Sequence, residues 1–339
     1  MNIKDIAKLS GVGVSTVSRV LNNHPDVKDS TREKVLQVVK EHKYIPNNSA
    51  RILKQINTKN IGILVKGMFN PFFSEMINII GCKINDLGYT MILNQNYSDE
   101  KMDVEVLKAF VKEKRLEGVI ALGGDFIDIN EEDIRDIDVP IVITSPNNCN
   151  TYIKDSYSCI SIDNEKAAYE ATEFLIKQSG NIALMIGDSF NKHGLDKERL
   201  SGFKKALENY NISFNEDNLL EGLYRYDESY KVCKKLLETN NDIDAILATS
   251  DNMAIGCAKA VVDSGKVVGS DISIIGFDGM EISEYYNPPI STVKQPKEIM
   301  ANKSIELLFD LINGNENHKQ IILDTQLIIR DSSKYKHDN

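Results

Sequence analysis

Two patterns of apolar and polar residues divide the chain. From Asn60 onward, apolar runs of strand length alternate with longer amphipathic stretches. The apolar runs are NIGILV, TMILNQ, GVIALG, PIVITS, NIALMIG, AILATS and DISIIGF. The amphipathic stretches cover about 72–87, 100–114, 164–178, 198–210, 227–239 and 251–264. This alternation predicts parallel, doubly wound sheets, and the number of units indicates two lobes rather than one.

The residues before Asn60 follow a different pattern, with apolar positions at helical spacing in three short segments. The first helix should end at Gly11, and the second is expected from about Val14 to Asn22. A third helix should begin at a cap formed by Ser30 or Asp29. The residues expected to face a shared core are Ile3, Ile6, Ala7, Leu9, Val17, Val20, Leu21, Val35, Val38, Val39 and His42. Three short helices joined by a Gly turn predict a helix-turn-helix module.

The charge of the chain is unevenly distributed. Its formal net charge is −10, yet residues 1–60 hold 11 Lys and Arg against 5 Asp and Glu. The rest of the chain holds 29 basic and 45 acidic residues. This asymmetry indicates a module that binds a polyanion, attached to an acidic body.

The second helix has a polar face suited to a DNA groove. Ser15, Thr16, Ser18 and Arg19 lie away from its apolar face. Hydroxyls and a guanidinium can bond base edges and phosphates, and arginine suits guanine in a bidentate arrangement. The alternative is a plain three-helix bundle with a polar surface, but the basic surplus of the same segment favours DNA.

The stretch IKDIAKLSGVGVSTVSRVLNNHPDVKDSTREKVLQVVKEHKYIPNNSARILK resembles the DNA-binding headpiece of the lactose-repressor (LacI/GalR) family. The T-V-S-R core, the T-R-E-K-V third helix and the Y-I-P exit carry the resemblance. It implies that Val14, Ser15 and Arg19 face major-groove bases, while Thr16 and Ser18 contact phosphates or bases. Gly13 stands where the family usually has a capping Ser, a departure that keeps an acceptable N-cap but loses a possible phosphate contact.

The resemblance also implies a hinge after Pro46. The segment NNSARILKQ is too short for a stable isolated helix in water. In the family this segment becomes helical on operator DNA, so Ala50 and Leu53 match residues that enter the minor groove. Leu53 would then act as an apolar wedge between base pairs. The alternative is an exposed linker with an incidental leucine.

For the body, the resemblance implies two doubly wound, Rossmann-like lobes of the periplasmic-binding-protein type, joined by three crossing segments. We expect an all-α helix-turn-helix domain at 1–46 and a hinge helix and linker at 47–58. The N-terminal lobe should comprise 59–161 and 293–319, including a helix near 297–313. The C-terminal lobe should comprise 162–292 and 320–331, with IILDTQLIIR closing it. Residues 332–339 should form a disordered tail.

Ligands of doubly wound sheets lie beyond the carboxyl ends of the strands. The family's ligand-binding residues align with a set of residues at such places in this sequence. This set comprises Phe72, Phe73, Ser145, Arg199, Tyr224, Ser250, Asp278 and Gln295. Arg199 and Asp278 would bond adjacent hydroxyls as donor and acceptor, above an aromatic platform. Ser145 replaces an Asp found in many relatives, which leaves the identity of the ligand open.

Several residues and motifs receive a structural interpretation. Asp163 and Asp251 each precede a predicted helix and are expected to be caps rather than ligands. The five cysteines include no C-x-x-C pair and are expected to be free thiols of a reducing cytosol. The scattered histidines suggest no metal site. Glycine-rich phosphate loops and a nucleophile elbow do not occur, so we expect no cofactor and no enzymatic activity.

The helix-turn-helix pattern and the charge asymmetry predict a DNA-binding module. The resemblance implies a sequence-specific transcriptional regulator, a repressor of carbohydrate-use genes, whose operator affinity is set by a small effector. The expected partners are a pseudo-palindromic double-stranded operator, a sugar or sugar phosphate, and a second copy in a homodimer. One alternative keeps the DNA but replaces the effector with a phosphorylated carrier protein. Another is a sugar-binding transport protein. Without a signal peptide, an apolar span or a leucine-heptad tail, we expect a cytoplasmic dimer with no membrane contact.

Overall fold

The computed structural model describes residues 1–21, 23–44, 59–66, 71–96, 103–149, 151–187, 195–240, 242–315 and 317–333. The chain forms two compact units, Met1–Thr58 and Lys59–Asn339. The boundary agrees with the start of the body expected near residue 59. The predicted hinge at 47–58, with Ala50 and Leu53, lies outside the described residues.

The first unit contains the predicted three helices, α1 (Ile3–Ser10), α2 (Val14–Leu21) and α3 (Asp29–Glu41). Between α1 and α2, Gly11 takes a left-handed backbone conformation, with φ 65°, that most side chains resist. The core consists of Ile6, Ala7, Val17, Val20 and Val35. The helix-turn-helix prediction is therefore confirmed.

Three details of this unit differ from the prediction. Leu9 is 51% exposed, because Ser10 fills the corresponding core position and donates to the Ile6 carbonyl at 2.6 Å. The N-cap of α3 is Lys28, which makes no side-chain cap bond, so neither Ser30 nor Asp29 caps it. The helix ends at Glu41, which leaves His42 exposed at the C-cap rather than in the core.

The first lobe of the body is built on a six-stranded sheet with the order β13-β7-β5-β3-β1-β2. Its strands are β1 (Asn60–Lys66), β2 (Thr90–Asn96), β3 (Gly118–Leu122), β5 (Ile141–Thr144), β7 (Ser158–Ile162) and β13 (Gln320–Leu323). Its helices are α5 (Pro71–Asp86), α6 (Asp103–Lys114), α7 (Glu131–Ile137) and α13 (Lys297–Ile312). The short strands β4 (Asp125–Phe126) and β6 (Asn148–Cys149) pair beside it, before the turn η1 (Thr151–Ile153).

The second lobe has a six-stranded sheet with the order β14-β12-β11-β10-β8-β9. Its strands are β8 (Ile182–Ile186), β9 (Leu219–Glu221), β10 (Ala245–Ala248), β11 (Ser273–Asp278), β12 (Ser291–Lys294) and β14 (Gln326–Ile328). Its helices are α8 (Asn164–Ile176), α9 (Leu195–Asn209), α10 (Tyr226–Thr239), α11 (Asp251–Asp263) and α12 (Glu281–Tyr285), with 3₁₀ turns η2 (Glu216–Asn218) and η3 (Asp331–Ser333).

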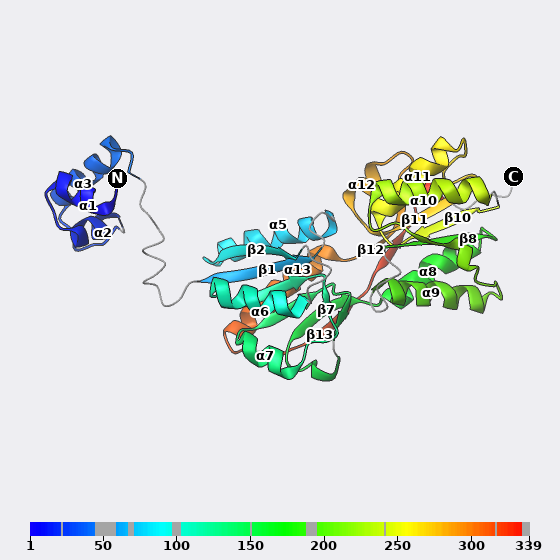
Figure 1. Ribbon diagram of the computed structural model, residues 1–339, viewed down its shortest axis with the longest axis horizontal. Coiled ribbons are helices and arrows are strands. Elements are labelled where there is room, and N and C mark those ends of the chain that lie inside the picture. Colours follow the sequence, from blue (N-terminus) through cyan, green and yellow to red (C-terminus); the bar gives the residue numbers. More distant parts are fainter. Residues whose placement is uncertain are drawn as a thin grey trace. The chain divides into compact units, whose positions relative to one another are not determined.

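Helices cover both faces of each sheet, as Figure 1 shows for the second lobe, where α10 and α11 lie on one face and α8 and α9 on the other. In the first lobe, α5 and α13 pack on one face and α6 and α7 on the other. Central strands such as β3 and β8 are consequently buried along their whole length. Burial on both faces explains why their sequences are continuous apolar runs.

The chain passes between the lobes at 162–164, 294–297 and 323–326, between elements that belong to different sheets. Three predicted boundaries differ from the structure. Val293 and Lys294 belong to β12 of the second sheet, so the first lobe does not resume at 293. Residues 320–323 pair with β7 in the first lobe, so only the second half of IILDTQLIIR closes the second lobe. Ser332 and Ser333 are buried and hydrogen-bonded to Ile274 and Ser291, so the predicted disordered tail does not begin at 332.

Each sheet contains one point where the direction of winding reverses. The first sheet winds from β1 to β2 on one side and then continues with β3 on the other side of β1. The second sheet does the same at β8, with β9 on one side and β10 on the other. The carboxyl ends of β1 and β3, and of β8 and β10, therefore mark the two places where such sheets bind ligands.

Candidate functional site

The outer face of α2 is the candidate DNA-reading surface. Val17 and Val20 are buried, while Val14 is 41% exposed and Ser15 and Arg19 are exposed. Thr16 and Ser18, the other two residues predicted to contact DNA, are half-buried. The structure thus places the predicted contact residues on the solvent side of a helix whose apolar side is fixed in the core.

Gly13 occupies the cap position at the start of α2. Its carbonyl accepts hydrogen bonds from the backbone N–H groups of Thr16 and Val17, at 2.9 and 3.0 Å. A side chain at Gly13 would meet its nearest neighbour, the Ser15 hydroxyl, at 3.6 Å, which is an ordinary contact. The helix therefore begins correctly without a capping hydroxyl, and the position has room for one.

Arg32 of α3 braces the turn that follows α2. Its guanidinium donates to the Asn23 side-chain oxygen at 2.6 Å and to the His24 carbonyl at 2.5 Å. The planar guanidinium of Arg32 thus links α3 to two adjacent residues of the turn, which a lysine ammonium could not do in the same geometry. This role could not be predicted from the sequence, because the contact depends on the path of the turn.

In the body, Arg199 is a buried cation held by three neighbours. It is 3% exposed, and its guanidinium carbon lies 3.6 Å from the centre of the Phe277 ring. Its Nε donates to Asn164 at 3.0 Å and its Nη1 donates to the Thr249 carbonyl at 2.6 Å. The second amino group of the fork, Nη2, has no acceptor among the described residues. Arg199 can therefore present one end of its fork to a ligand.

Asp278 and Gln295 form a second buried polar pair. Gln295 donates through Nε2 to the Asp278 carboxylate at 2.7 Å, and the two residues are 2% and 4% exposed, respectively. The backbone of Asp278 has φ 103°, a strained conformation for a residue with a side chain. Because Nε2 faces the carboxylate, Oε1 of Gln295 points elsewhere, and it has no partner among the described residues.

Tyr224 is positioned by a hydrogen bond to Asp196 and by the space that Gly187 leaves for its ring. Its hydroxyl donates to the Asp196 carboxylate at 2.6 Å. Its ring occupies the space beside Gly187, where a Cβ atom would lie only 1.9 Å from the ring. Burial, and next the charge of Asp196, raise the pKa of Tyr224 well above its usual value, so the phenol stays protonated as a donor.

Ser250, rather than the predicted Asp251, caps α11. Ser250, predicted to bind effector, is the N-cap of α11 and accepts from the Met253 backbone at 3.3 Å. Asp251, predicted to be that cap, is fully buried and accepts from the Met280 backbone at 2.6 Å. Burial, and next the charge of Asp278, raise the pKa of Asp251 to about 8. Asp163, in contrast, caps α8 as predicted.

The first lobe contributes Phe73 and Ser145 at its carboxyl edge. The edge of the Phe73 ring is close to Gly123, which follows β3, and the Lys66 carbonyl at the end of β1 is beside it. Ser145 follows β5 with φ 51° and is half-buried. Phe72 differs from the prediction that it stacks on a ligand, because it is 2% exposed and belongs to the core beneath α5.

Lys66 and Asp103 form a charged pair at the same edge. Lys66 Nζ lies 3.3 Å from Asp103, and the carboxylate also accepts from the Asn96 side chain at 2.6 Å and the Asp125 backbone at 2.7 Å. Asp103 is 3% exposed. The cation at the winding reversal of the first sheet is thus already neutralised by a buried partner.

Contacts with the loop after β11 connect the two groups of predicted residues. Met280 is 1% exposed and belongs to the core cluster of the first lobe that includes Phe72. Lys297 pairs with Glu75 of α5 and also donates to the Gly279 carbonyl at 3.3 Å. The strained Asp278 therefore precedes a segment that is fixed against the first lobe.

Sequence analysis did not identify Asp196, Asn164 or Phe277. Asp196 lies three residues before Arg199 on α9, a spacing that places both on one helix face and could have identified it. Asn164 and Phe277 contact Arg199 from α8 and β11. No local pattern predicts those contacts, because the partners are separated by 35 residues or more.

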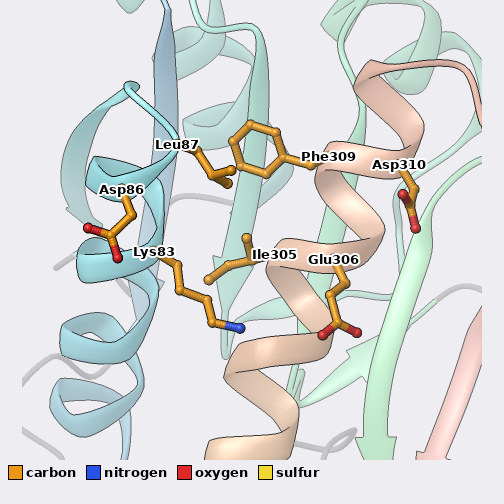
Figure 2. A pocket seen from close by; sticks show the side chains of 7 residues that line it. All are labelled: Lys83, Asp86, Leu87, Ile305, Glu306, Phe309 and Asp310. Atoms are coloured by element: carbon orange, nitrogen blue, oxygen red, sulfur yellow. The ribbon is translucent and has the colours of Figure 1, made fainter.

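A groove on the first lobe lies away from these residues. It has a volume of about 590 Å³ and is formed by α5 and α13. Figure 2 shows its lining, in which Leu87 lies beside Phe309 and three carboxylates accompany a single lysine. The lining residues are Lys83, Asp86, Leu87, Ile305, Glu306, Phe309 and Asp310.

We also searched the described residues for metal sites, disulfides and membrane-spanning helices. Within the described part of the chain, no group of three or more His, Cys, Asp or Glu residues could hold a metal ion. Cys82, Cys159, Cys233 and Cys257 are free thiols. None of the helices described here is long and apolar enough to span a bilayer.

Comparisons with known proteins cover both units. Residues 2–47 match the bacterial regulatory proteins of the lacI family, and residues 172–333 match a periplasmic binding protein-like domain. The transcriptional regulator MalR of Clostridium butyricum is 57% identical over 332 residues, covering 98% of this chain and 99% of that protein. The transcriptional repressor PurR of Vibrio vulnificus is 32% identical over 337 residues and 98% of each chain.

Two solved structures show the same architecture over nearly the whole length. The complex of the transcriptional regulator CelR with cellobiose has a TM-score of 0.71 at 28% identity, covering 98% of this chain and all of that one. The lac repressor dimer bound to operator and the anti-inducer ONPF has a TM-score of 0.72 at 25% identity, covering 98% and 99%.

Proposed function

The chain belongs to the lacI family of bacterial regulatory proteins, and from this membership we propose that it is a transcriptional repressor of carbohydrate-use genes. The helix-turn-helix unit binds operator DNA, and a sugar or sugar phosphate bound by the body sets the operator affinity. An effector can change that affinity only if it binds the two states of the protein unequally.

One observation carries this proposal. The chain combines a basic three-helix unit, whose α2 exposes Val14, Ser15 and Arg19, with an α/β body. In that body Asp278 ends β11, and Arg199 of α9 stacks on the preceding Phe277. A ligand-controlled regulator requires a DNA-binding unit and a small-molecule site, and this chain contains candidates for both.

The relatives support a carbohydrate effector. The solved CelR structure is a complex with cellobiose, and MalR is a regulator. In this chain, Arg199, Tyr224, Asp278 and Gln295 supply donors and acceptors, and Phe73 is the aromatic candidate at the edge of the first lobe. Several fixed polar groups beside an aromatic ring suit a hydroxylated ligand.

We propose that the active form is a homodimer on a pseudo-palindromic operator. One headpiece covers half of such a site, so two-fold symmetry in the DNA requires two copies of the protein. The lac repressor was solved as a dimer bound to its operator. Ala50 and Leu53 of the hinge would then meet at the centre of the site and enter the minor groove.

The same relatives support two further parts of the proposal, which concern enzymatic activity and location. The related proteins are transcriptional regulators, so a purely regulatory, non-enzymatic role is proposed for this chain too. Action on chromosomal DNA would place it in the cytoplasm. No cofactor or metal enters the proposal.

The two alternatives have less support. A phosphorylated carrier protein would bring negative charge, and the groove between α5 and α13 offers it Asp86, Glu306 and Asp310 against the single Lys83. Like charges oppose that docking. A transport protein would have no use for the DNA-binding unit of residues 2–47.

Selection of genomic fragments by the purified full-length chain tests the proposal, followed by addition of neutral and phosphorylated sugars to the bound fragments. We expect enrichment of a palindromic site near carbohydrate genes, and a change of at least tenfold in its affinity with one of the sugars. Enrichment of no site over random duplex would reject DNA-binding regulation. A site that responds only to a phosphorylated carrier protein would favour the first alternative.

A further inference from the structure

Asp196 spans the winding reversal of the second sheet. Its Oδ2 accepts from the Gly187 backbone, at the end of β8, at 3.2 Å. Its Oδ1 accepts from the Thr249 hydroxyl, at the end of β10, at 2.9 Å. A carboxylate bonded to the carboxyl ends of both strands stands where doubly wound sheets bind their ligands.

The same carboxylate is linked to the candidate effector residues. Tyr224 donates its hydroxyl to Asp196 at 2.6 Å. Thr249, whose hydroxyl donates to Asp196, also accepts Arg199 through its carbonyl at 2.6 Å. The charges of Asp196 and Asp278 both contribute to the raised pKa of Tyr224, so the two carboxylates act on one phenol. Asp196 is therefore part of the group formed by Arg199, Tyr224 and Asp278.

This group is rich in hydrogen-bond acceptors. The Asp196 carboxylate accepts from Gly187, Tyr224 and Thr249, and the Asp278 carboxylate accepts from Gln295. The buried Oε1 of Gln295 is a further acceptor, and it has no partner among the described residues. An amide oxygen that is buried and unpaired calls for a donor from elsewhere. The cationic donor of the group is Arg199, one guanidinium beside two carboxylates. Lys66, at the edge of the first sheet, is already paired with Asp103.

We propose that Asp196 is a specificity-determining residue of the effector site, which selects a neutral, hydroxyl-rich ligand against its phosphorylated counterpart. The inference rests on the proposed function and narrows its effector class. A sugar hydroxyl can donate to a carboxylate or to the Gln295 oxygen, whereas a phosphate dianion brings only acceptors and meets two like charges. The Nη2 group of Arg199, which has no acceptor among the described residues, can donate to a hydroxyl oxygen of such a ligand.

Matched pairs of ligands test the inference on the full-length protein. Isothermal titration compares maltose with maltose 6′-phosphate and cellobiose with cellobiose 6′-phosphate. The neutral member of the pair that binds is expected to bind at least tenfold more tightly. In Asp196→Asn this ratio should fall about tenfold or more, because the repelling charge is gone. The exposed Asp217→Asn changes the net charge equally and should keep the wild-type ratio.

A second variant separates charge from structure. Thr249→Val removes one hydrogen bond to Asp196 but leaves its charge, so the neutral-to-phosphorylated ratio should stay within about twofold of wild type. A ratio that falls as far in Thr249→Val as in Asp196→Asn would assign Asp196 a merely structural role. Thermal melting of all variants shows whether each is folded when its ratio is measured.

Binding of the ligand pairs to the wild-type protein is a test in itself. Tighter binding of a phosphorylated member overturns the role of Asp196 and leaves carbohydrate control of DNA binding intact. If no member of either pair binds, and no sugar alters operator binding, then the inference and the proposed effector class are both wrong. Preference for a neutral member that persists in Asp196→Asn rejects Asp196 as its source.

Discussion

Gln295 donates a hydrogen bond to Asp278 and so joins the segment after β12 to the end of β11, with 2.7 Å between the two atoms. Asp278 keeps a strained backbone at φ 103°, and the pair is almost completely buried. Strain that the surrounding structure maintains is common at functional sites. A buried, strained acceptor beside an unpaired amide oxygen is more readily explained by a ligand than by stability alone.

Asp278→Asn should therefore abolish the response to effector. The amide keeps the shape and tolerates positive φ, but it loses the charge that would accept sugar hydroxyls. We expect at least a tenfold loss of effector affinity, about 1.4 kcal/mol or more, by calorimetry. The melting temperature should stay close to that of the wild type. A large fall in melting temperature with normal affinity would make Asp278 a structural residue.

Arg199→Lys should lower both stability and effector binding. Lysine cannot reproduce the bonds to Asn164 and the Thr249 carbonyl together with the stacking on Phe277. Loss of hydrogen bonds from a buried charge typically costs about 1.5–3 kcal/mol each, so we expect a total of at least 2 kcal/mol. Urea unfolding measures the stability. An unchanged midpoint would show that the forked geometry is not needed.

Gly187→Ala should disturb Tyr224 without touching any charged group. The new methyl would lie 1.9 Å from the Tyr224 ring, so the ring must move. Overpacking of this kind costs about 1–3 kcal/mol, and effector affinity should fall with it. Gly180→Ala is the matched control, because its nearest neighbour would be 3.8 Å away. Equal tolerance of both substitutions would contradict the assigned position of the ring.

Asp251 should make the protein less stable as the pH rises. Its folded-state pKa of about 8 lies above the ordinary value of 3.8, so between these values the folded chain holds a proton that the unfolded chain releases. The stability from this group is full below pH 4 and is lost toward pH 8, by at most about 1.4 kcal/mol per pH unit. Unfolding of Asp251→Asn between pH 5.5 and 8.5 should show a flatter curve than the wild type. Parallel curves for the two proteins would argue against the raised pKa.

Arg19→Ala should weaken operator binding and relax its specificity. An exposed arginine on α2 can bond a guanine through two atoms, and such a contact contributes about 1–3 kcal/mol. Wild-type affinity should also fall by about a decade or more between 50 and 200 mM salt. Arg225→Ala removes the same charge from the body, where Arg225 pairs with Asp227, and should have little effect. Band-shift titrations that show equal losses for both variants would remove α2 from the interface.

The spacing of apolar residues along the sequence was sufficient to predict most of the strands and helices. Continuous apolar runs such as GVIALG became strands buried on both faces, and every long amphipathic stretch became a helix. IILDTQLIIR was the exception. It contains two short strands in different lobes, but their apolar pattern is the same as that of one longer strand. Only the partners distinguish them, since Ile321 lies against β7 and Leu327 against β12.

The candidate site was predicted less completely. The resemblance nominated Asp278 and Gln295, which follow neighbouring strands of the second sheet, and Arg199 of α9, which stacks on Phe277. It also nominated Phe72 as a stacking residue. Phe72 repeats at helical spacing with Met76 and Ile80, and these three are buried together. That spacing indicated a core residue. The partners of Arg199 come from other elements, and their positions depend on how the sheet is wound.

The late crossing at 323–326 has a consequence for any shortened form of the protein. β13 and β14 are the outer strands of different sheets, yet only two residues separate them. Loss of the last twenty or so residues would therefore strip an edge from both halves of the body at once. Neither half can be expressed as one uninterrupted stretch, so an engineered chain of either half alone would have to rejoin separated segments of the sequence.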